Sequence, residues 1–175
     1  EAKIGNVIEV PFDSTAFSNG FDSDDLLQIT KPYTFSPELG EVVGEHKGAH
    51  YYTIGQRRGL NIGGYEKPLF VIGTDTDKNV IYTGSGDDHP GLYRKGLFVP
   101  TVDEHWIRED LKLKIGESKN YQARIRYRQP LEKCTLHQKE EGLYIIFDRP
   151  QRGVTPGQFA AWYENEELIG SGVID

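Results

Sequence analysis

Short runs of alternating apolar and polar residues dominate the last eighty residues of the chain. Six of them, separated by turn signals, have the length and the period of two that half-buried strands show. They are GLFVPTV (96–102), NYQARIRYRQP (120–130), KCTLHQ (133–138), GLYIIFD (142–148), FAAWYEN (159–165) and ELIGSGVID (167–175). No helical periodicity stands out after residue 60. The pattern predicts an antiparallel, six-stranded-type β-barrel over residues 92–175.

Residues 1–91 have a different pattern, which predicts a small α+β domain. GNVIEVP (5–11) has the β-branched content of one strand closed by Pro11, and residues 41–45 are a second candidate. Residues 48–53 fit a short helical or turn segment, and PLFVIGTDTDKNVIYTG (68–84) fits a β-hairpin with its turn at residues 75–79. The glycines and aspartates of GSGDDHPG (84–91) place the domain boundary near Gly91. The fold class is therefore mainly β.

Residues 13–37 interrupt this first domain with a segment rich in Ser, Asp, Thr, Gly and Pro. Such a composition is typical of a long surface excursion. One helical turn is expected at Asp24–Gln28, with Ser23 as its N-cap.

Composition narrows the class of protein. The single cysteine, Cys134, cannot form a disulfide framework or a four-thiolate zinc site, which fits a reducing cytosol. No apolar run approaches the roughly 18 residues that cross a bilayer, and the first residues lack a signal-peptide layout. We therefore expect a cytoplasmic protein with no membrane partner. The opening Glu1 and the absence of methionine suggest a piece excised from something longer.

The net charge of −7 argues at first against nucleic acid as a partner, because phosphates are bound by Lys and Arg. The acids, however, concentrate at the start of the chain. Residues 1–50 carry nine acidic and three basic side chains, and the remaining residues carry 18 and 17. The rest of the chain is close to neutral.

Two arginine-rich stretches are candidates for binding phosphates. On a strand, YQARIRYR (121–128) would place Arg124, Arg126 and Arg128 on one face, spaced roughly 6 to 7 Å apart. Planar guanidinium donors in a row suit a phosphodiester backbone. A solvated strand face whose arginines pair with neighbouring glutamates would have the same sequence.

The second stretch is HYYTIGQRRGLNIGG (50–64), where Gln56, Arg57 and Arg58 lie between Gly55 and Gly59. Glycines allow the backbone to approach a ligand, and adjacent arginines can reach different phosphates. A tight surface turn with two solvated arginines explains the pattern equally well.

Other motifs in the chain are weaker evidence for a metal, catalytic or nucleotide site. DTDKN (75–79) resembles a calcium loop but has Val80 where glycine is required, and His46 and His50 lack the zinc-binding HExxH order. Alternation places Cys134 on the inner face of its strand, as a core residue. No phosphate-binding loop motif of a nucleotide site occurs in the chain.

Taken in order, GEHKGAHYYTIGQRRGLNIGG, the hairpin with DHPGLY, RIRYRQPLEKCTL, FDRPQRGVTPGQFAAWY and GSGVID resemble the central and C-terminal domains of tRNA-specific 2-thiouridylases. Older descriptions call them tRNA (5-methylaminomethyl-2-thiouridylate) methyltransferases. The resemblance covers residues 1–11 and 38–175. Residues 13–37 depart from it and are expected to be a lineage-specific insertion.

The resemblance implies an enzyme that thiolates C2 of the wobble uridine of tRNA. An N-terminal domain, with ATP and magnesium as cofactors, adenylates the C2 oxygen. A persulfide cysteine, which receives its sulfur from a sulfur-relay donor protein, and a partner cysteine then deliver that sulfur to the uridine. The phosphate loop and both cysteines precede the point that matches Glu1. This chain is therefore expected to bind no cofactor or metal and to be inactive alone.

The resemblance also implies where tRNA binds. The family's contacts fall on Arg126, Tyr127 and Gln158, and they hold the anticodon stem-loop. Further candidates, from charge and glycine content, are Gln56, Arg57, Arg58, Arg124 and Arg128. Two other functions stay open: a protein-interaction module that contacts a sulfur carrier or the catalytic domain, and a stand-alone RNA-binding barrel similar to those of translation factors.

Overall fold

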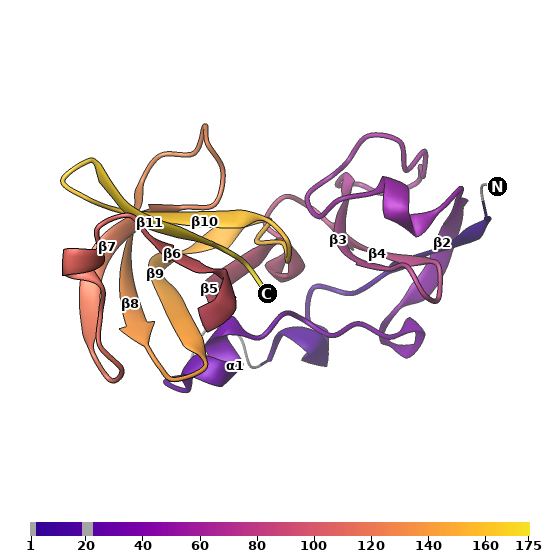
Figure 1. Ribbon diagram of the computed structural model, residues 1–175. Coiled ribbons are helices and arrows are strands. Elements are labelled where there is room, and N and C mark those ends of the chain that lie inside the picture. Colours follow the sequence, from indigo (N-terminus) through magenta and orange to yellow (C-terminus); the bar gives the residue numbers. More distant parts are fainter. Residues whose placement is uncertain (1–2, 19–22) are drawn as a thin grey trace. The chain divides into compact units, whose positions relative to one another are not determined.

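The computed structural model describes residues 3–18 and 23–175, and its secondary structure is mainly β (Figure 1). The chain divides into two compact units. Unit 1 comprises Glu1–Asn19 and Pro32–Tyr93, and unit 2 comprises Gly20–Lys31 and Arg94–Asp175. The division after Tyr93 lies two residues from the boundary that the sequence predicts. This division differs from the predicted domains in one respect: Gly20–Lys31, the middle of the segment 13–37, belongs to unit 2.

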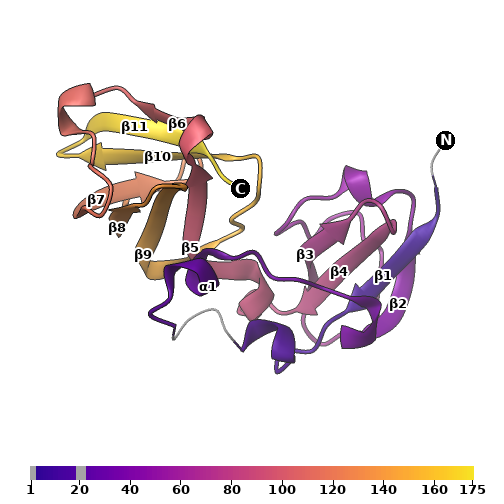
Figure 2. The same cartoon turned by 60° about the horizontal axis from the view of Figure 1, so that its bottom comes forward.

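Unit 1 is built on a four-stranded sheet with the strand order β2-β1-β4-β3 (Figure 2). β1 (Gly5–Glu9) pairs antiparallel with β2 (Glu41–His46) and parallel with β4 (Val80–Ser85). β3 (Leu69–Asp75) and β4 form the predicted hairpin. Asn79, just before β4, has a φ of 56°, which Asn tolerates in turns. Short 3₁₀ helices lie at Thr15–Phe17, Pro37–Leu39, Ala49–Tyr51 and Pro90–Leu92.

Both faces of this sheet are buried, because successive side chains of a strand point to opposite sides. One face packs Ile8, Val10, Phe17, Phe70, Ile72, Val80, Tyr82 and Leu92. The other packs Val7, Ala49, Leu60, Leu69, Val71 and Ile81. This arrangement explains why β3 and β4 have continuous apolar runs rather than strict alternation.

Two buried histidines stabilise the backbone of unit 1. Nδ1 of His46 accepts a hydrogen bond from the N–H of Gly48 (2.9 Å), and Nε2 donates to the carbonyl of Asn79 (3.1 Å). His89 makes the same two bonds: its Nδ1 accepts from the N–H of Gly91, and its Nε2 donates to the carbonyl of Val10. One accepting and one donating nitrogen define a neutral imidazole. Burial lowers the pKa of both rings below the ordinary value.

Unit 2 is a seven-stranded curled sheet with the order β5-β9-β8-β7-β10-β11-β6. The strands are β5 (Tyr93–Pro100), β6 (Glu104–Trp106), β7 (Ser118–Arg124), β8 (Glu132–Gln138), β9 (Gly142–Arg152), β10 (Phe159–Glu164) and β11 (Glu167–Val173); 3₁₀ helices lie at Thr101–Asp103 and Glu109–Leu111. The backbone N–H of Asp175 donates to the carbonyl of Phe98 on β5 (3.0 Å), so the curl returns to its first strand. The barrel has one strand more than predicted, because β6 is too short to show alternation.

The barrel core lies on the concave side of this sheet. Trp106 and Trp162 meet edge to face inside it, with ring centroids 5.2 Å apart. Trp162 is fully buried, and around the pair pack inward-facing residues of nearly every strand, among them Tyr121, Cys134 and Phe147. This placement confirms Cys134 as a core residue.

The only α-helix of the described residues, α1 (Leu26–Thr30), belongs to unit 2. Its N-cap is Asp25, whose side chain accepts from the N–H of Leu27 (2.9 Å). The prediction of Ser23 as N-cap is wrong, because that hydroxyl accepts from the N–H of Asp25 instead. Arg94 at the start of the barrel is buried and donates to the carbonyl of Thr30, which fixes the end of α1.

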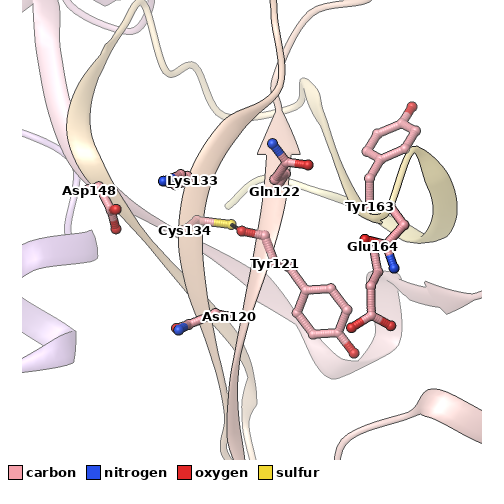
Figure 3. Close-up of a pocket in the computed structure, with 9 residues that line it drawn as sticks. Asn120, Tyr121, Gln122, Lys133, Cys134, Asp148, Tyr163 and Glu164 are labelled. Carbon is pink, nitrogen blue, oxygen red and sulfur yellow. Dashed lines mark hydrogen bonds between the residues drawn. The ribbon is translucent and has the colours of Figure 1, made fainter.

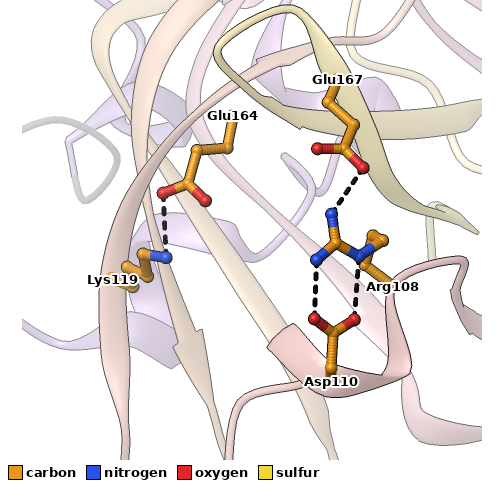
Figure 4. Close-up of polar contacts among 5 residues, drawn as sticks. All are labelled: Arg108, Asp110, Lys119, Glu164 and Glu167. Carbon is orange, nitrogen blue, oxygen red and sulfur yellow. Dashed lines mark hydrogen bonds and ion pairs between the residues drawn. The ribbon is translucent and has the colours of Figure 1, made fainter.

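Ion pairs flank the turn between β10 and β11 (Figure 4). Arg108 bonds both carboxylate oxygens of Asp110 (2.8 and 2.6 Å) and one of Glu167 (2.6 Å). On the other side of the turn, Lys119 pairs with Glu164 at 2.9 Å. Exposed pairs of this kind add little stability.

Candidate nucleic-acid interface

Strand β7 ends at Arg124, which still pairs with Ala161 of β10, and the chain then turns through residues 125–129. Within the turn, the N–H of Gln129 donates to the carbonyl of Arg126 (3.1 Å), so local bonds replace those of the sheet. The predicted row of Arg124, Arg126 and Arg128 on one strand face is therefore wrong. Only the first of the three lies on a strand.

The turn 125–129 presents three side chains to solvent. Arg126 and Arg128 are exposed, and 85% of Tyr127 is accessible. An aromatic side chain that exposed has almost none of its apolar surface buried by the fold. Arg126 has one fixed contact, from Nη2 to the carbonyl of Gly153 (3.0 Å).

A second loop, residues 153–158, lies beside this turn. Besides the bond from Arg126 to Gly153, the side-chain amide of Gln129 donates to the side chain of Gln151, which is buried. The side-chain Oε1 of Gln129 also accepts from the N–H of Ile125 (3.2 Å). Residues far apart in the sequence therefore hold the turn and the loop together.

Gln158 ends this second loop and leads into β10. Its carbonyl accepts from the N–H of Ile174 (2.8 Å), and the N–H of Gly157 donates to the carbonyl of Ile174 (2.8 Å). The side-chain Oε1 of Gln158 is buried and has no hydrogen-bond partner among the described residues. The predicted trio thus lies on two adjacent segments: Arg126 and Tyr127 on the turn, and Gln158 on the loop that contacts the turn through Gly153.

Positive charge is concentrated on the turn and on the stretches that flank the turn and the loop. Residues 124–130 and 148–158 together hold five arginines and one acidic side chain, although the whole chain carries −7. Arg149 is exposed at the end of β9, near the loop. The protein is acidic overall and locally basic, and a local surplus of arginine favours a polyanion as ligand.

Arg124 is tied into the fold rather than free. Nη1 donates to the carbonyl of Tyr127 (2.9 Å) and Nη2 donates to the hydroxyl of Tyr163 (2.8 Å). The guanidinium carbon also lies over both aromatic rings, 5.3 Å from the centroid of Tyr127 and 5.0 Å from that of Tyr163.

Tyr163 lines a groove of about 420 Å³ along β7 and β10 (Figure 3). Cys134 also lines it, and its thiol donates to the carbonyl of Tyr121 (3.5 Å). Burial raises the pKa of Cys134 to about 12. A thiol with so high a pKa is protonated at neutral pH and is unsuited to nucleophilic chemistry.

The glycine-framed stretch of unit 1 forms a surface loop. Gln56 holds it together: its Oε1 accepts from the N–H of Thr53 (3.2 Å) and its Nε2 donates to the carbonyl of Arg58 (2.8 Å). Arg57 and Arg58 are exposed, and Arg57 lines a shallow groove of about 420 Å³ with Tyr65 and neighbouring residues. Gln56 therefore shapes the loop, and the two arginines are its accessible cations.

The described residues include neither a long α-helix nor a cluster of metal-ligating side chains. α1 has only five residues and begins at an aspartate, whose charge repels phosphates. No group of three or more His, Cys, Asp or Glu in residues 3–18 and 23–175 is arranged to hold a metal. In the same residues, no helix is long and apolar enough to span a membrane.

Comparison with known proteins gives the family. Residues 28–85 match the model described as tRNA methyl transferase PRC-barrel domain, and residues 99–174 match that of the aminomethyltransferase beta-barrel domain. Proteins named tRNA-specific 2-thiouridylase from Christiangramia forsetii and Flavobacterium johnsoniae are each 51% identical over 99% of this chain. The chain belongs to the tRNA-specific 2-thiouridylase family. It spans 45% of the length of these two relatives.

A third 2-thiouridylase, from Karelsulcia muelleri, is 48% identical over 83% of this chain, which spans 38% of that relative. Because the first two relatives match over 99% of the chain, the segment 13–37 has a counterpart in them. Within the 2-thiouridylase family the segment is therefore shared by at least these two proteins.

The sequence pattern did not predict some residues of this candidate interface. Gly153 and Gln151 organise the loop, and Tyr163 bonds Arg124, yet none stood out as a candidate. The two arginines of the DRPQR motif, Arg149 and Arg152, were the available signal, because they come directly after the apolar run 142–148 and occupy the last part of β9.

Proposed function

We propose that this chain is the RNA-docking part of a tRNA 2-thiouridylase, and that the turn 125–129 and the loop 153–158 contact the anticodon stem-loop. The observation that carries the proposal is the exposed pair Arg126 and Tyr127 on a turn fixed to a second, arginine-flanked loop. Family membership supplies tRNA as the substrate class.

Each side chain has a role that its setting supports. Arg126 donates one N–H to the carbonyl of Gly153, and its other N–H groups can donate to a phosphate. Tyr127 offers an exposed ring on which an unpaired base can stack. Gln158 offers its amide to a sugar or base, and Arg128 is a second cation on the turn. Arg57 and Arg58 of unit 1 add cations for the RNA backbone.

For the whole enzyme, we propose the chemistry that the family implies. A catalytic domain outside this chain would use ATP and magnesium to adenylate C2–O of the wobble uridine. A persulfide cysteine of that domain, loaded by a sulfur-relay donor protein in the cytoplasm, would then transfer its outer sulfur to C2, where the C2–O bond breaks and AMP leaves with the oxygen. A partner cysteine would form a disulfide with the first cysteine and so supply the two electrons that the sulfur gains. This chain would only position the RNA and be inactive by itself, since its one thiol is buried and protonated.

Fluorescence anisotropy with a labelled anticodon stem-loop tests the docking role. Arg126→Ala should weaken binding and lower the slope of log K against log salt by about one unit, as expected for one lost phosphate contact. Lys114→Ala is the matched control. It removes one exposed positive charge from the turn that precedes β7, whereas Arg126 lies on the turn that follows this strand.

Equal binding by wild type, Arg126→Ala and Lys114→Ala would refute the assignment of Arg126. Absence of any salt-dependent RNA binding by the wild-type chain would instead favour a protein-interaction module, which a pull-down with the sulfur donor in the absence of RNA would detect.

A further inference from the structure

We infer that Arg124 is a positioning residue, which together with Tyr163 holds Tyr127 in an orientation ready to stack on an unpaired base. The inference rests on the proposed function and adds to it how the turn recognises RNA. Nothing in the sequence pattern distinguishes Arg124 from its neighbours Arg126 and Arg128, and only the contacts separate them.

The contacts join three side chains into one cluster, with Arg124 at its centre. The guanidinium of Arg124 lies over the rings of Tyr127 and Tyr163, at 5.3 and 5.0 Å from their centroids. It also bonds the carbonyl of the first and the hydroxyl of the second. Arg124 therefore contacts both the backbone and the ring of Tyr127, a residue that remains 85% exposed.

This cluster is anchored on two paired strands. Arg124 is the last residue of β7 and is half-buried, and Tyr163 pairs with Gln122 in the ladder between β10 and β7. Arg124 is poorly placed to bind a phosphate, because two of its N–H groups bond the two tyrosines and its guanidinium lies over their rings. A tyrosine held in position loses less conformational entropy when a base stacks on it, which strengthens binding.

A double-mutant cycle separates positioning from direct contact. The probes are a stem-loop RNA with unpaired loop bases and a blunt RNA duplex with the same number of phosphates. Tyr127→Ala should weaken stem-loop binding roughly 5- to 150-fold, the usual range for a stacked base. Arg124→Lys keeps the charge but loses the planar fork, and should weaken it about 2- to 12-fold, the cost of ordering one side chain.

Positioning predicts that Arg124→Lys has no further effect in the Tyr127→Ala background and leaves the salt slope and duplex binding unchanged. Tyr163→Phe removes only one hydroxyl and should act in the same direction, so a fold defect in Arg124→Lys would not remove the test. Arg108→Lys, which loses a fork that bonds only carboxylates, is the control and should bind normally.

Independent, additive losses from Arg124→Lys and Tyr127→Ala would overturn the inference, and so would normal stem-loop binding by Tyr163→Phe and Arg124→Lys. In either case a weakened Tyr127→Ala variant would leave the docking role intact. If Tyr127→Ala and Arg126→Ala both bind as wild type, the proposed function itself fails.

Discussion

Gly153 tests whether the loop 153–158 and the turn 125–129 act together. Its φ is +70°, a conformation that favours glycine, and an added Cβ would overlap Nη2 of Arg126. Gly153→Ala should therefore do two things at once: strain the backbone and displace the guanidinium from the carbonyl it now contacts. The charge of Arg126 is unchanged, so any loss of RNA binding comes from its position.

Gly157→Ala, in the same loop, separates the two effects. Its φ is +83°, and an added Cβ would have nothing within 4 Å. This variant carries only the cost of the left-handed backbone, about 1 to 2 kcal/mol. Gly153→Ala carries the same cost plus the loss of the hydrogen bond from Arg126, about 0.5 to 1.5 kcal/mol more. The guanidinium is flexible and exposed, so the steric part itself is small.

Urea unfolding followed by tryptophan fluorescence measures this difference. Both tryptophans, Trp106 and Trp162, lie in the core of unit 2, so the signal reports that unit whatever unit 1 does. Gly153→Ala should have the lower midpoint of the two variants, and only Gly153→Ala should weaken binding of the anticodon stem-loop. Equal midpoints and equal RNA affinities for the two variants would refute the contact between Arg126 and Gly153.

Two further predictions concern buried groups. Burial lowers the folded-state pKa of His46 and His89, so unit 1 should be fully stable above about pH 6.5 and lose stability as the pH falls below it. Hydrogen exchange of the β1 and β4 amides between pH 7 and 5 should show this loss. The variant His89→Asn should make stability depend less on pH. A slope of the opposite sign would contradict the neutral histidines. Cys134, with a buried thiol and a pKa of about 12, should not react with a thiol reagent at pH 8 until the protein is unfolded; rapid labelling of the native chain would show that the barrel does not protect it.

The parts of the fold that the sequence predicts are those with local signals. The hairpin of β3 and β4 has two apolar runs around a polar turn, and β8 shows clean alternation around Cys134 and Leu136. Three-residue β6 has no room for a period, so it escapes detection. The attachment of α1 to unit 2 depends on Arg94, 64 residues after the carbonyl that it bonds, and no local pattern reveals such a partner.

The same distinction applies to the candidate site. Arg126 and Tyr127 are exposed on a turn, because β7 ends at Arg124, sooner than the alternation suggests. The side chain of Gln129 takes the N–H of Ile125, and a carbonyl 27 residues away takes the guanidinium of Arg126. Whether an arginine is free or committed, as Arg124 is, depends on partners from other strands and cannot be inferred from spacing.

The discontinuous course of the chain has a consequence for how such proteins can be recombined. The chain passes between its units after residues 19, 31 and 93, and α1 contributes to the barrel from within the first third of the sequence. A barrel transplanted by a single cut at Arg94 would leave that arginine buried without the carbonyl of Thr30. Exchange of the barrel between relatives would therefore succeed only when the earlier segment travels with it, so the two pieces of unit 2 are expected to be inherited together.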